Sequence, residues 1–386
     1  MKPILLLAAG LATAAATFAQ DTTKRASGRV PVVYTVMNSA AATPVKSQGA
    51  TGTCWCFSTT SLVESQSLKN KLGTYDLSEM FTVRNIYIEK GKNYILRQGH
   101  AQFGEGGLGH DLIRAIGTYG AMPESVYSGV KAEEKGYDHS KMAPALKKYL
   151  DSILTLNPVP SNWLTGYTAI LDETMGVPPA RFTYNGKEYT PKTFAAEALK
   201  FNPDDYVNIT SFTHHPYYQP FIIEVPDNFS NGAYYNLPLE EMIGLAKSVL
   251  GKGYSLMWDA DVSNPGFIAK FGTALNLDGL KLGDQEMKNK VEMIANNPQE
   301  GAWNAARRQE LFEGLVTQDD HLMHITGLEK DKNGKTFFLV KNSWGEGGPY
   351  KGYVNVSEAY FAINTISLVI PKAAIDKTLL DKLKIK

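Results

Sequence analysis

The order of the predicted elements constrains this chain more than any other feature, because helical patterns come first and strand patterns come last. Apolar residues recur at helical spacing in three early segments, at residues 54–71, 77–95 and 111–119. β-branched and aromatic residues gather between Gly and Asn turns in three late segments, at residues 323–330, 336–341 and 352–356. Separate runs of helices and strands predict an α+β fold in two lobes.

Two less regular stretches are expected to be insertions between these parts. Residues 138–236 hold a Tyr-, Pro- and Asn-rich segment, and residues 263–315 are expected to be mostly helical. We divide the rest of the mature chain into four parts: residues 20–137, a helix and strand at 237–262, a strand-rich lobe at 316–370 and a C-terminal arm at 371–386.

The first residues have the pattern of a secretory signal peptide. A positive start at Met1-Lys2 precedes an apolar, alanine-rich run that lasts to about Ala19. Thr17 and Ala19 place small residues at the positions that a signal peptidase reads, so residues 1–19 predict export, to the periplasm or the medium of a bacterium. A membrane anchor is the alternative, but the run is too short and too rich in alanine to span a bilayer comfortably.

Charge and cysteine content exclude several other classes of protein. Lys plus Arg and Asp plus Glu both number 39, so no excess charge favours nucleic acid or a membrane surface. The two cysteines, Cys54 and Cys56, stand too close in sequence to form a disulfide without distorting the backbone. A free cysteine in an exported protein suggests chemistry, although a small buried apolar residue is the alternative, and we favour that alternative for Cys56.

Cys54 has the sequence context of an activated thiol. Gly49 and Gly52 permit a tight turn just before it, and the predicted helix begins at Cys54, so backbone N–H groups would favour a thiolate there. Gln48 lies across the same turn, where its side-chain amide could donate to an oxyanion.

The imidazole that completes such a site is expected to be His321. His321 precedes one predicted strand and Asn342 follows the next, so antiparallel pairing would let Asn342 fix the imidazole tautomer while Trp344 shields their hydrogen bond. His324 is expected on the opposite face of the strand. His214 and His215 have no third ligand at a usual spacing, so we expect packed or solvated histidines and no metal.

Three separated motifs resemble those of the papain superfamily of cysteine peptidases. They are the cysteine segment QGATGTCWCFS at 48–58, the histidine strand HLMHITG at 321–327 and the asparagine motif KNSWG at 341–345. The bleomycin hydrolase/aminopeptidase C branch is the most similar, through Leu77-Ser78-Glu79, Gly106-Gly107 and the long insertions before His321.

This resemblance implies that residues 20–386 form one papain-like peptidase domain, with a helical lobe and a β-barrel-like lobe around a cleft. Cys54 is then the nucleophile, His321 the base, Asn342 its orienting residue and Gln48 an oxyanion donor, without any cofactor. Gly106, Gly107 and Trp344 are expected to contact a peptide substrate.

The resemblance also implies an aminopeptidase whose C-terminal arm occupies the cleft, and a homo-oligomer, commonly a hexamer. The tail Lys384-Ile385-Lys386 does not match that of the branch, so an endopeptidase of the same mechanism is the main alternative. A catalytically dead papain-fold binding protein and an amidase or acyltransferase are the others.

Overall fold

The computed structural model describes residues 32–131, 136–296 and 299–386. The expected signal peptide at 1–19 lies outside the described residues, so export stays a prediction. Within the described part of the chain, no helix has both the length and the apolar character to cross a bilayer.

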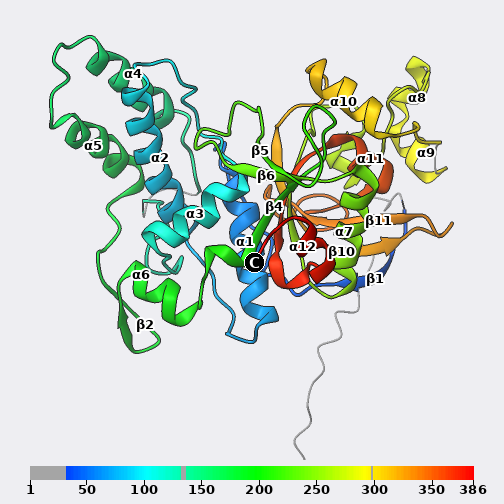
Figure 1. Ribbon diagram of the computed structural model, residues 1–386, viewed down its shortest axis with the longest axis horizontal. Coiled ribbons are helices and arrows are strands. Elements are labelled where there is room, and N and C mark those ends of the chain that lie inside the picture. Colours follow the sequence, from blue (N-terminus) through cyan, green and yellow to red (C-terminus); the bar gives the residue numbers. More distant parts are fainter. Residues whose placement is uncertain (1–31, 132–135, 297–298) are drawn as a thin grey trace, which may run out of the picture.

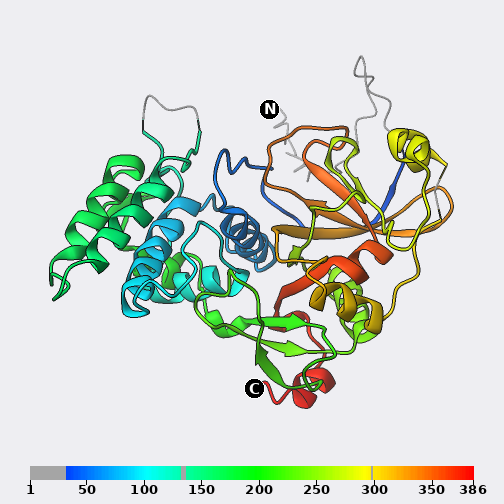
Figure 2. The same cartoon turned by 90° about the horizontal axis from the view of Figure 1, so that it is seen from above.

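Two lobes pack on either side of the central helix α1 (Cys54–Lys69) (Figures 1 and 2). One lobe is helical and the other contains most of the strands, as the order of the sequence patterns predicts. Nearly every side chain of α1 is buried, including the polar ones, which is why this helix lacks a polar stripe.

The longer helices of the helical lobe surround α1 on one side (Figure 2). They are α2 (Glu79–Leu96), α3 (Gly109–Tyr119), α4 (Met142–Leu154) and α5 (Trp163–Met175). Helix α2 begins two residues after its predicted start at 77, because the Ser78 side chain caps it by accepting from the Phe81 N–H.

The other lobe is built on an 11-stranded sheet. Its main path runs β5 (Pro220–Ile222), β6 (Ala233–Asn236), β4 (Tyr206–Thr210), β13 (Thr365–Pro371), β7 (Leu256–Ala260), β10 (His321–Lys330), β11 (Thr336–Lys341), β12 (Tyr353–Ser357), β9 (Thr273–Ala274) and β8 (Phe267–Ile268). Strand β1 (Thr35–Ser39) also pairs with β10. Among the described residues this path does not close into a ring, so the lobe is an open sheet where a barrel-like one was expected.

Successive side chains of β7 pack into the cores on opposite faces of the sheet. Trp258 points into the core of the strand-rich lobe, where it stacks on Phe361 of α11 (Glu358–Asn364), beside α7 (Leu239–Gly251). Met257 points the other way, into the core shared with α1 and the helical lobe. The sheet therefore holds α1 against one face and its own helices against the other.

The two expected insertions are more closely tied to this sheet than the sequence suggests. Within 138–236, β4 pairs with β13 and β6 pairs with β4, so residues 206–236 extend the main sheet. Within 263–315, β9 pairs with β12, and three short helices follow, α8 (Asp284–Lys288), α9 (Lys290–Ala295) and α10 (Ala305–Glu313). Strands of two to five residues carry too little alternation to stand out from an irregular sequence.

Part of 138–236 does stand apart from the sheet. Besides α4 and α5 it forms the hairpin of β2 (Phe182–Tyr184) and β3 (Lys187–Tyr189). One helical turn, α6 (Pro191–Thr193), follows the hairpin and continues into a π-helix at Phe194–Ala198.

The C-terminal arm packs outside the cleft, which corrects the arrangement that the family resemblance implies. Helix α12 (Lys377–Lys382) lies at the C-terminal end, against the strand-rich lobe (Figure 2). Leu379 and Leu380 pack against the core of that lobe, and Leu383 is buried in it. The Lys252 ammonium holds the start of the arm by donating to the Ala374 carbonyl and the Asp376 carboxylate. The apolar residues at 379, 380 and 383 explain this placement, because burying them keeps the arm on the lobe.

Candidate active site

Cys54 is the first residue of α1 and faces a cleft of about 710 Å³ between the lobes. Its side chain is almost buried, with 8% exposed. Thr53 precedes the helix, and its carbonyl accepts the Cys56 and Phe57 N–H groups. Among the described residues the Cys54 N–H donates no hydrogen bond. It is one of the unpaired N–H groups at the start of the helix, next to the thiol.

The turn before Cys54 needs glycine at residue 49. Gly49 has φ of +63°, and a Cβ there would lie 2.3 Å from the Tyr137 carbonyl oxygen. The Ala50 N–H donates to that same carbonyl, so the turn is fastened to the helical lobe.

His321 and Asn342 meet as their predicted strands imply. Strand β10 begins at His321, Asn342 follows β11, and these two strands are antiparallel neighbours. His321 Nε2 lies 2.8 Å from Asn342 Oδ1, and the Ser343 N–H also donates to Oδ1 at 2.7 Å. Because that backbone donor requires an oxygen, Nε2 of His321 carries the proton, and Nδ1 is free to take a proton from a neighbour.

Trp344 covers the imidazole. The rings of His321 and Trp344 stack with centroids 4.6 Å apart and an angle of 28° between them. Trp344 is itself 46% exposed, unusual for a residue of its size, so one edge of the indole is open to the cleft.

Gln48 is also held in one orientation. Its Oε1 accepts from the Ser343 hydroxyl at 2.6 Å, and its Nε2 donates to the Thr51 carbonyl at 2.7 Å. The side chain is buried but lines the cleft with Cys54. An amide nitrogen has two hydrogens, so one remains for a substrate oxygen.

Burial favours the neutral forms of the thiol and the imidazole when each is considered alone. It raises the pKa of the Cys54 thiol to about 12 and lowers the pKa of His321, although the Asn342 hydrogen bond opposes the latter shift. Each shift disfavours an isolated charge, so a thiolate at Cys54 depends on the helix N-terminus and on a proton accepted by His321.

A glycine-rich loop forms the opposite wall of the cleft. Gly106 and Gly107 both line it, and a Cβ on Gly107 would contact the Trp55 ring at 3.2 Å. The Trp55 indole N–H donates to the Glu105 carbonyl, and the Glu105 carboxylate accepts from the Gly52 N–H. These bonds tie the glycine loop to the turn that precedes Cys54.

The cleft also contains carboxylates that the motifs do not reveal. Asp227 and Glu105 line it together with Asp319 and Asp320, the acidic pair next to His321. The Asp320 carboxylate accepts hydrogen bonds from the Val262 N–H and the Ser263 hydroxyl. Asp227 follows Gly106 by more than a hundred residues, so no local spacing links the two.

Asp319 faces the buried Asp259 of β7. Burial raises the pKa of Asp259 to about 7 and also raises the pKa of Asp319 well above its ordinary range. Two neighbouring carboxyl groups in such surroundings retain a proton between them.

The other sulfur and imidazole near the motif lie away from the cleft. Cys56 is fully buried, and its Sγ donates to the Glu79 carbonyl. His324 points at α1, where Nδ1 contacts the Ser61 hydroxyl at 2.8 Å. That hydroxyl also accepts from the Lys341 ammonium, so it donates to His324. Both residues belong to the packing behind the site.

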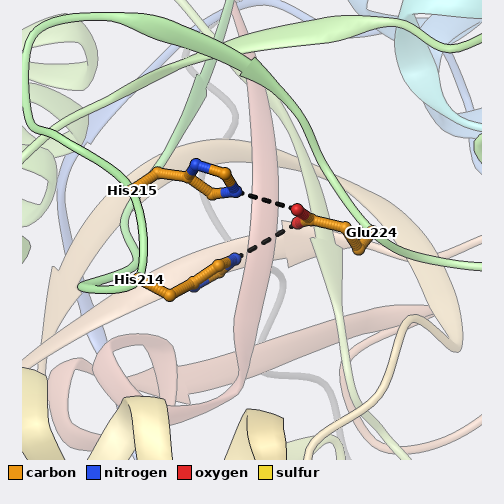
Figure 3. Close-up of side chains that lie close together, drawn as sticks. All are labelled: His214, His215 and Glu224. Carbon is orange, nitrogen blue, oxygen red and sulfur yellow. Dashed lines mark hydrogen bonds and ion pairs between the residues drawn. The ribbon is translucent and has the colours of Figure 1, made fainter.

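His214 and His215 meet a third group, Glu224, that sequence spacing does not show (Figure 3). Their Nε2 atoms lie 3.2 and 2.8 Å from its two carboxylate oxygens. Gln309 fixes the proton on His214: its Oε1 accepts the Thr213 N–H, so its Nε2 donates to His214 Nδ1. The proton of His214 then sits on Nε2 and is donated to Glu224. This tautomer makes Nε2 a hydrogen-bond donor in place of a metal ligand.

Comparison with known proteins agrees with the fold and the motifs. Residues 162–386 match the Peptidase C1-like family, and residues 31–85 match the papain family of cysteine proteases. Aminopeptidase C of Streptococcus thermophilus is 23% identical over 85% of this chain and 80% of its own length. Bleomycin hydrolase of Mus musculus is 22% identical over 87% of this chain and 82% of its own length.

A solved structure supports the fold independently. The PepW structure from Lactobacillus rhamnosis has a TM-score of 0.72 at 21% identity and covers 92% of this chain and 86% of its own. The family model spans more than half of the sequence and includes the histidine and asparagine motifs. This chain belongs to the Peptidase C1-like family of papain-type cysteine peptidases.

Proposed function

We propose that this protein is a cysteine aminopeptidase that hydrolyses short peptides through a thioester on Cys54. The observation that carries the proposal is the shared cleft of Cys54 and His321, with the proton of His321 directed at Asn342 and Nδ1 left free. The names of the similar proteins, aminopeptidases C, G and W, support action at a free amino end.

Acylation begins with the transfer of the Cys54 proton to Nδ1 of His321. The sulfur attacks the scissile carbonyl carbon, and the negative charge moves to the carbonyl oxygen. The Gln48 amide and the Cys54 N–H donate to that oxygen. When the tetrahedral intermediate collapses, the C–N bond breaks, and the leaving amine takes the proton from Nδ1.

Deacylation repeats these steps with water as the nucleophile. Nδ1 of His321 takes a proton from water as the oxygen attacks the thioester carbon. The C–S bond then breaks, and the departing sulfur recovers that proton, so a carboxylic acid leaves and the thiol is restored. Asn342 holds the imidazolium in both halves, because its oxygen accepts from Nε2 throughout.

An endopeptidase is the second candidate, and the position of the C-terminal arm favours it. The arm packs on the strand-rich lobe and contributes no residue to the lining of the cleft. If the arm is the only device that could shorten the cleft, longer substrates would enter.

Two fluorogenic dipeptides that differ only in a free or an acetylated amino end separate these candidates. We expect the wild-type protein in reducing buffer to cleave the free-amine substrate faster, and Cys54→Ala to lose at least about 10³-fold. Cys56→Ala is the matched control, with near wild-type kcat/KM expected. Faster cleavage of the acetylated substrate would establish the endopeptidase, and undiminished activity in Cys54→Ala would overturn the mechanism.

Two further parts of the proposal concern the whole protein. The pattern of residues 1–19 supports export, and cleavage after Ala19 would appear as a new amino terminus in the exported protein. The resemblance to the bleomycin hydrolase branch supports assembly into a hexamer, which sedimentation of the purified protein would measure.

A further inference from the structure

Asp227 stands at one end of the glycine loop, above Gly106. It lies between β5 and β6, on a segment that reaches across to the cleft from the sheet. A Cβ on Gly106 would lie 1.8 Å from Asp227 Oδ2, so the carboxylate covers the α-carbon directly. A peptide chain laid along the glycine loop toward Cys54 therefore meets this carboxylate.

The segment that carries Asp227 is fixed at both sides. Asn228 accepts from the Gly232 N–H and donates to the Ile223 carbonyl, which closes the segment on itself. Ser230 donates to the buried Asp111 carboxylate of α3 at 2.7 Å. The carboxylate of Asp227 is thus presented on a backbone tied to the helical lobe, and a rigid receptor loses little entropy when it binds.

One oxygen of this carboxylate is left for a ligand. The side-chain nitrogen of Gln102 donates to Asp227 Oδ1 at 3.0 Å, and the described residues supply no hydrogen bond to Oδ2. Burial raises the pKa of Asp227, and the nearby charge of Lys90 opposes that rise only in part. The Lys90 ammonium instead donates to the carbonyls of Gly104 and Gly106.

The cleft around Asp227 suits a cation. Its described lining contains four carboxylates and no Lys or Arg, and the only imidazole is that of His321. Glu105 accepts from the Gly52 N–H and the Tyr87 hydroxyl on Oε2, and Asp320 accepts from two donors on its own Oδ2. What distinguishes Asp227 is its place directly over Gly106, with Oδ2 open in the described residues. A substrate ammonium would supply the partner that Oδ2 lacks.

We infer that Asp227 binds the free α-amine of the peptide substrate and so sets the amino-end specificity of the cleft. This inference rests on the proposed peptidase function and deepens it. Asp227 provides a restriction that the C-terminal arm, packed outside the cleft, does not. An acetylated amino end carries no charge, so it would leave Oδ2 of Asp227 without a cationic partner.

Asp227→Asn in the full chain tests the inference, because the amide keeps the shape of the side chain and can still accept from Gln102. We expect kcat/KM for a free-amine fluorogenic dipeptide to fall at least about tenfold, and that for its acetylated twin to stay within about threefold. The exposed Asp204→Asn is the matched control, with both rates unchanged. Activity on the acetylated substrate also reports that the variant is folded.

Two outcomes would overturn the inference. One is an unchanged ratio of free-amine to acetylated rates in Asp227→Asn. The other concerns acetylated substrates that carry Lys or norleucine before the scissile bond. If Asp227→Asn removes a preference for Lys but leaves the free-amine preference intact, the carboxylate binds a basic side chain of the substrate and not its α-amine. Failure of the peptidase proposal is separate, since it shows as activity that survives in Cys54→Ala.

Discussion

The proton on His321 is placed by its neighbours. Asn342 Oδ1 receives both the imidazole and the Ser343 N–H, so the amide cannot turn its nitrogen toward the ring. Asn342→Ala should therefore free the ring and lower kcat/KM by about tenfold, the equivalent of one charge-assisted hydrogen bond. Asn333→Ala, on an exposed turn, is the control. Wild-type kinetics in Asn342→Ala would show that the stacked Trp344 alone holds the imidazole.

The pKa of His321 determines the pH below which kcat/KM falls. The imidazole must be neutral to take the thiol proton, and burial lowers its pKa below the ordinary value of about 6.5. As pH rises through this lowered pKa, the base is formed, so the acid limb of kcat/KM should lie below about pH 6.5. The dependence of kcat/KM on pH checks this prediction. An acid limb above about pH 6.5 would contradict a lowered pKa of His321.

The position of the Asp227 carboxylate leaves no room for a side chain at Gly106. In Gly106→Ala the new Cβ would occupy the position of Asp227 Oδ2, so the carboxylate must move and cleavage of a free-amine substrate should fall by about tenfold or more. Gly104→Ala is the comparison, because its Cβ would meet nothing within 4 Å and a much smaller effect follows. Equal losses of activity in the two variants would contradict a specific contact between residue 106 and the Asp227 carboxylate.

The residues proposed for the reaction lie in sequence motifs, whereas the residue proposed for specificity does not. Cys54, His321 and Asn342 each sit in a short motif, because a helix start and two strand ends must present them in fixed positions. Asp227 comes from a segment that only the folded chain brings over Gly106, so no pattern in the sequence reveals it. Glu224 reaches the two histidines in the same way.

At the scale of elements, segments with a clear local signal were predictable and the shortest strands were not. Helix α2 lies within a few residues of its predicted bounds, and its Ser78 cap marks the start. Strand β11 matches its predicted bounds because it is a run of aromatic and β-branched residues between turns. Strands β4, β6 and β9 are defined by their partners β13, β4 and β12, which lie far away in sequence. Their pairing comes from tertiary contacts that local propensity does not encode.

The cap of α2 gives a measurable stability term. Ser78→Ala removes the side chain that accepts from the Phe81 N–H, a bond that is buried, so the free energy of unfolding should fall by about 1 kcal/mol. Urea unfolding monitored by circular dichroism measures it. Ser140→Ala, on an exposed turn, should change the free energy far less, and an equal change in both variants would contradict the role of the cap.

At the scale of the whole molecule, the arm and the cleft are separate. Because Leu383 is buried in the strand-rich lobe, a chain that ends at residue 383 keeps most of the packing of α12. Removing residues 384–386 should leave the ratio of free-amine to acetylated cleavage unchanged within about twofold, while the melting temperature falls slightly because the partly buried Ile385 is lost. A shift of that ratio toward the acetylated substrate would place the tail in the cleft.

The central claim is that Cys54 is the nucleophile, and its alkylation tests this most directly. The wild-type protein is treated with limiting iodoacetamide, and peptide mapping follows Cys54 and Cys56 while peptidase activity is measured in the same samples. Activity should fall in step with modification of Cys54, which faces the cleft, while Cys56 stays unmodified in the core. Activity that persists after Cys54 is fully alkylated would contradict the account.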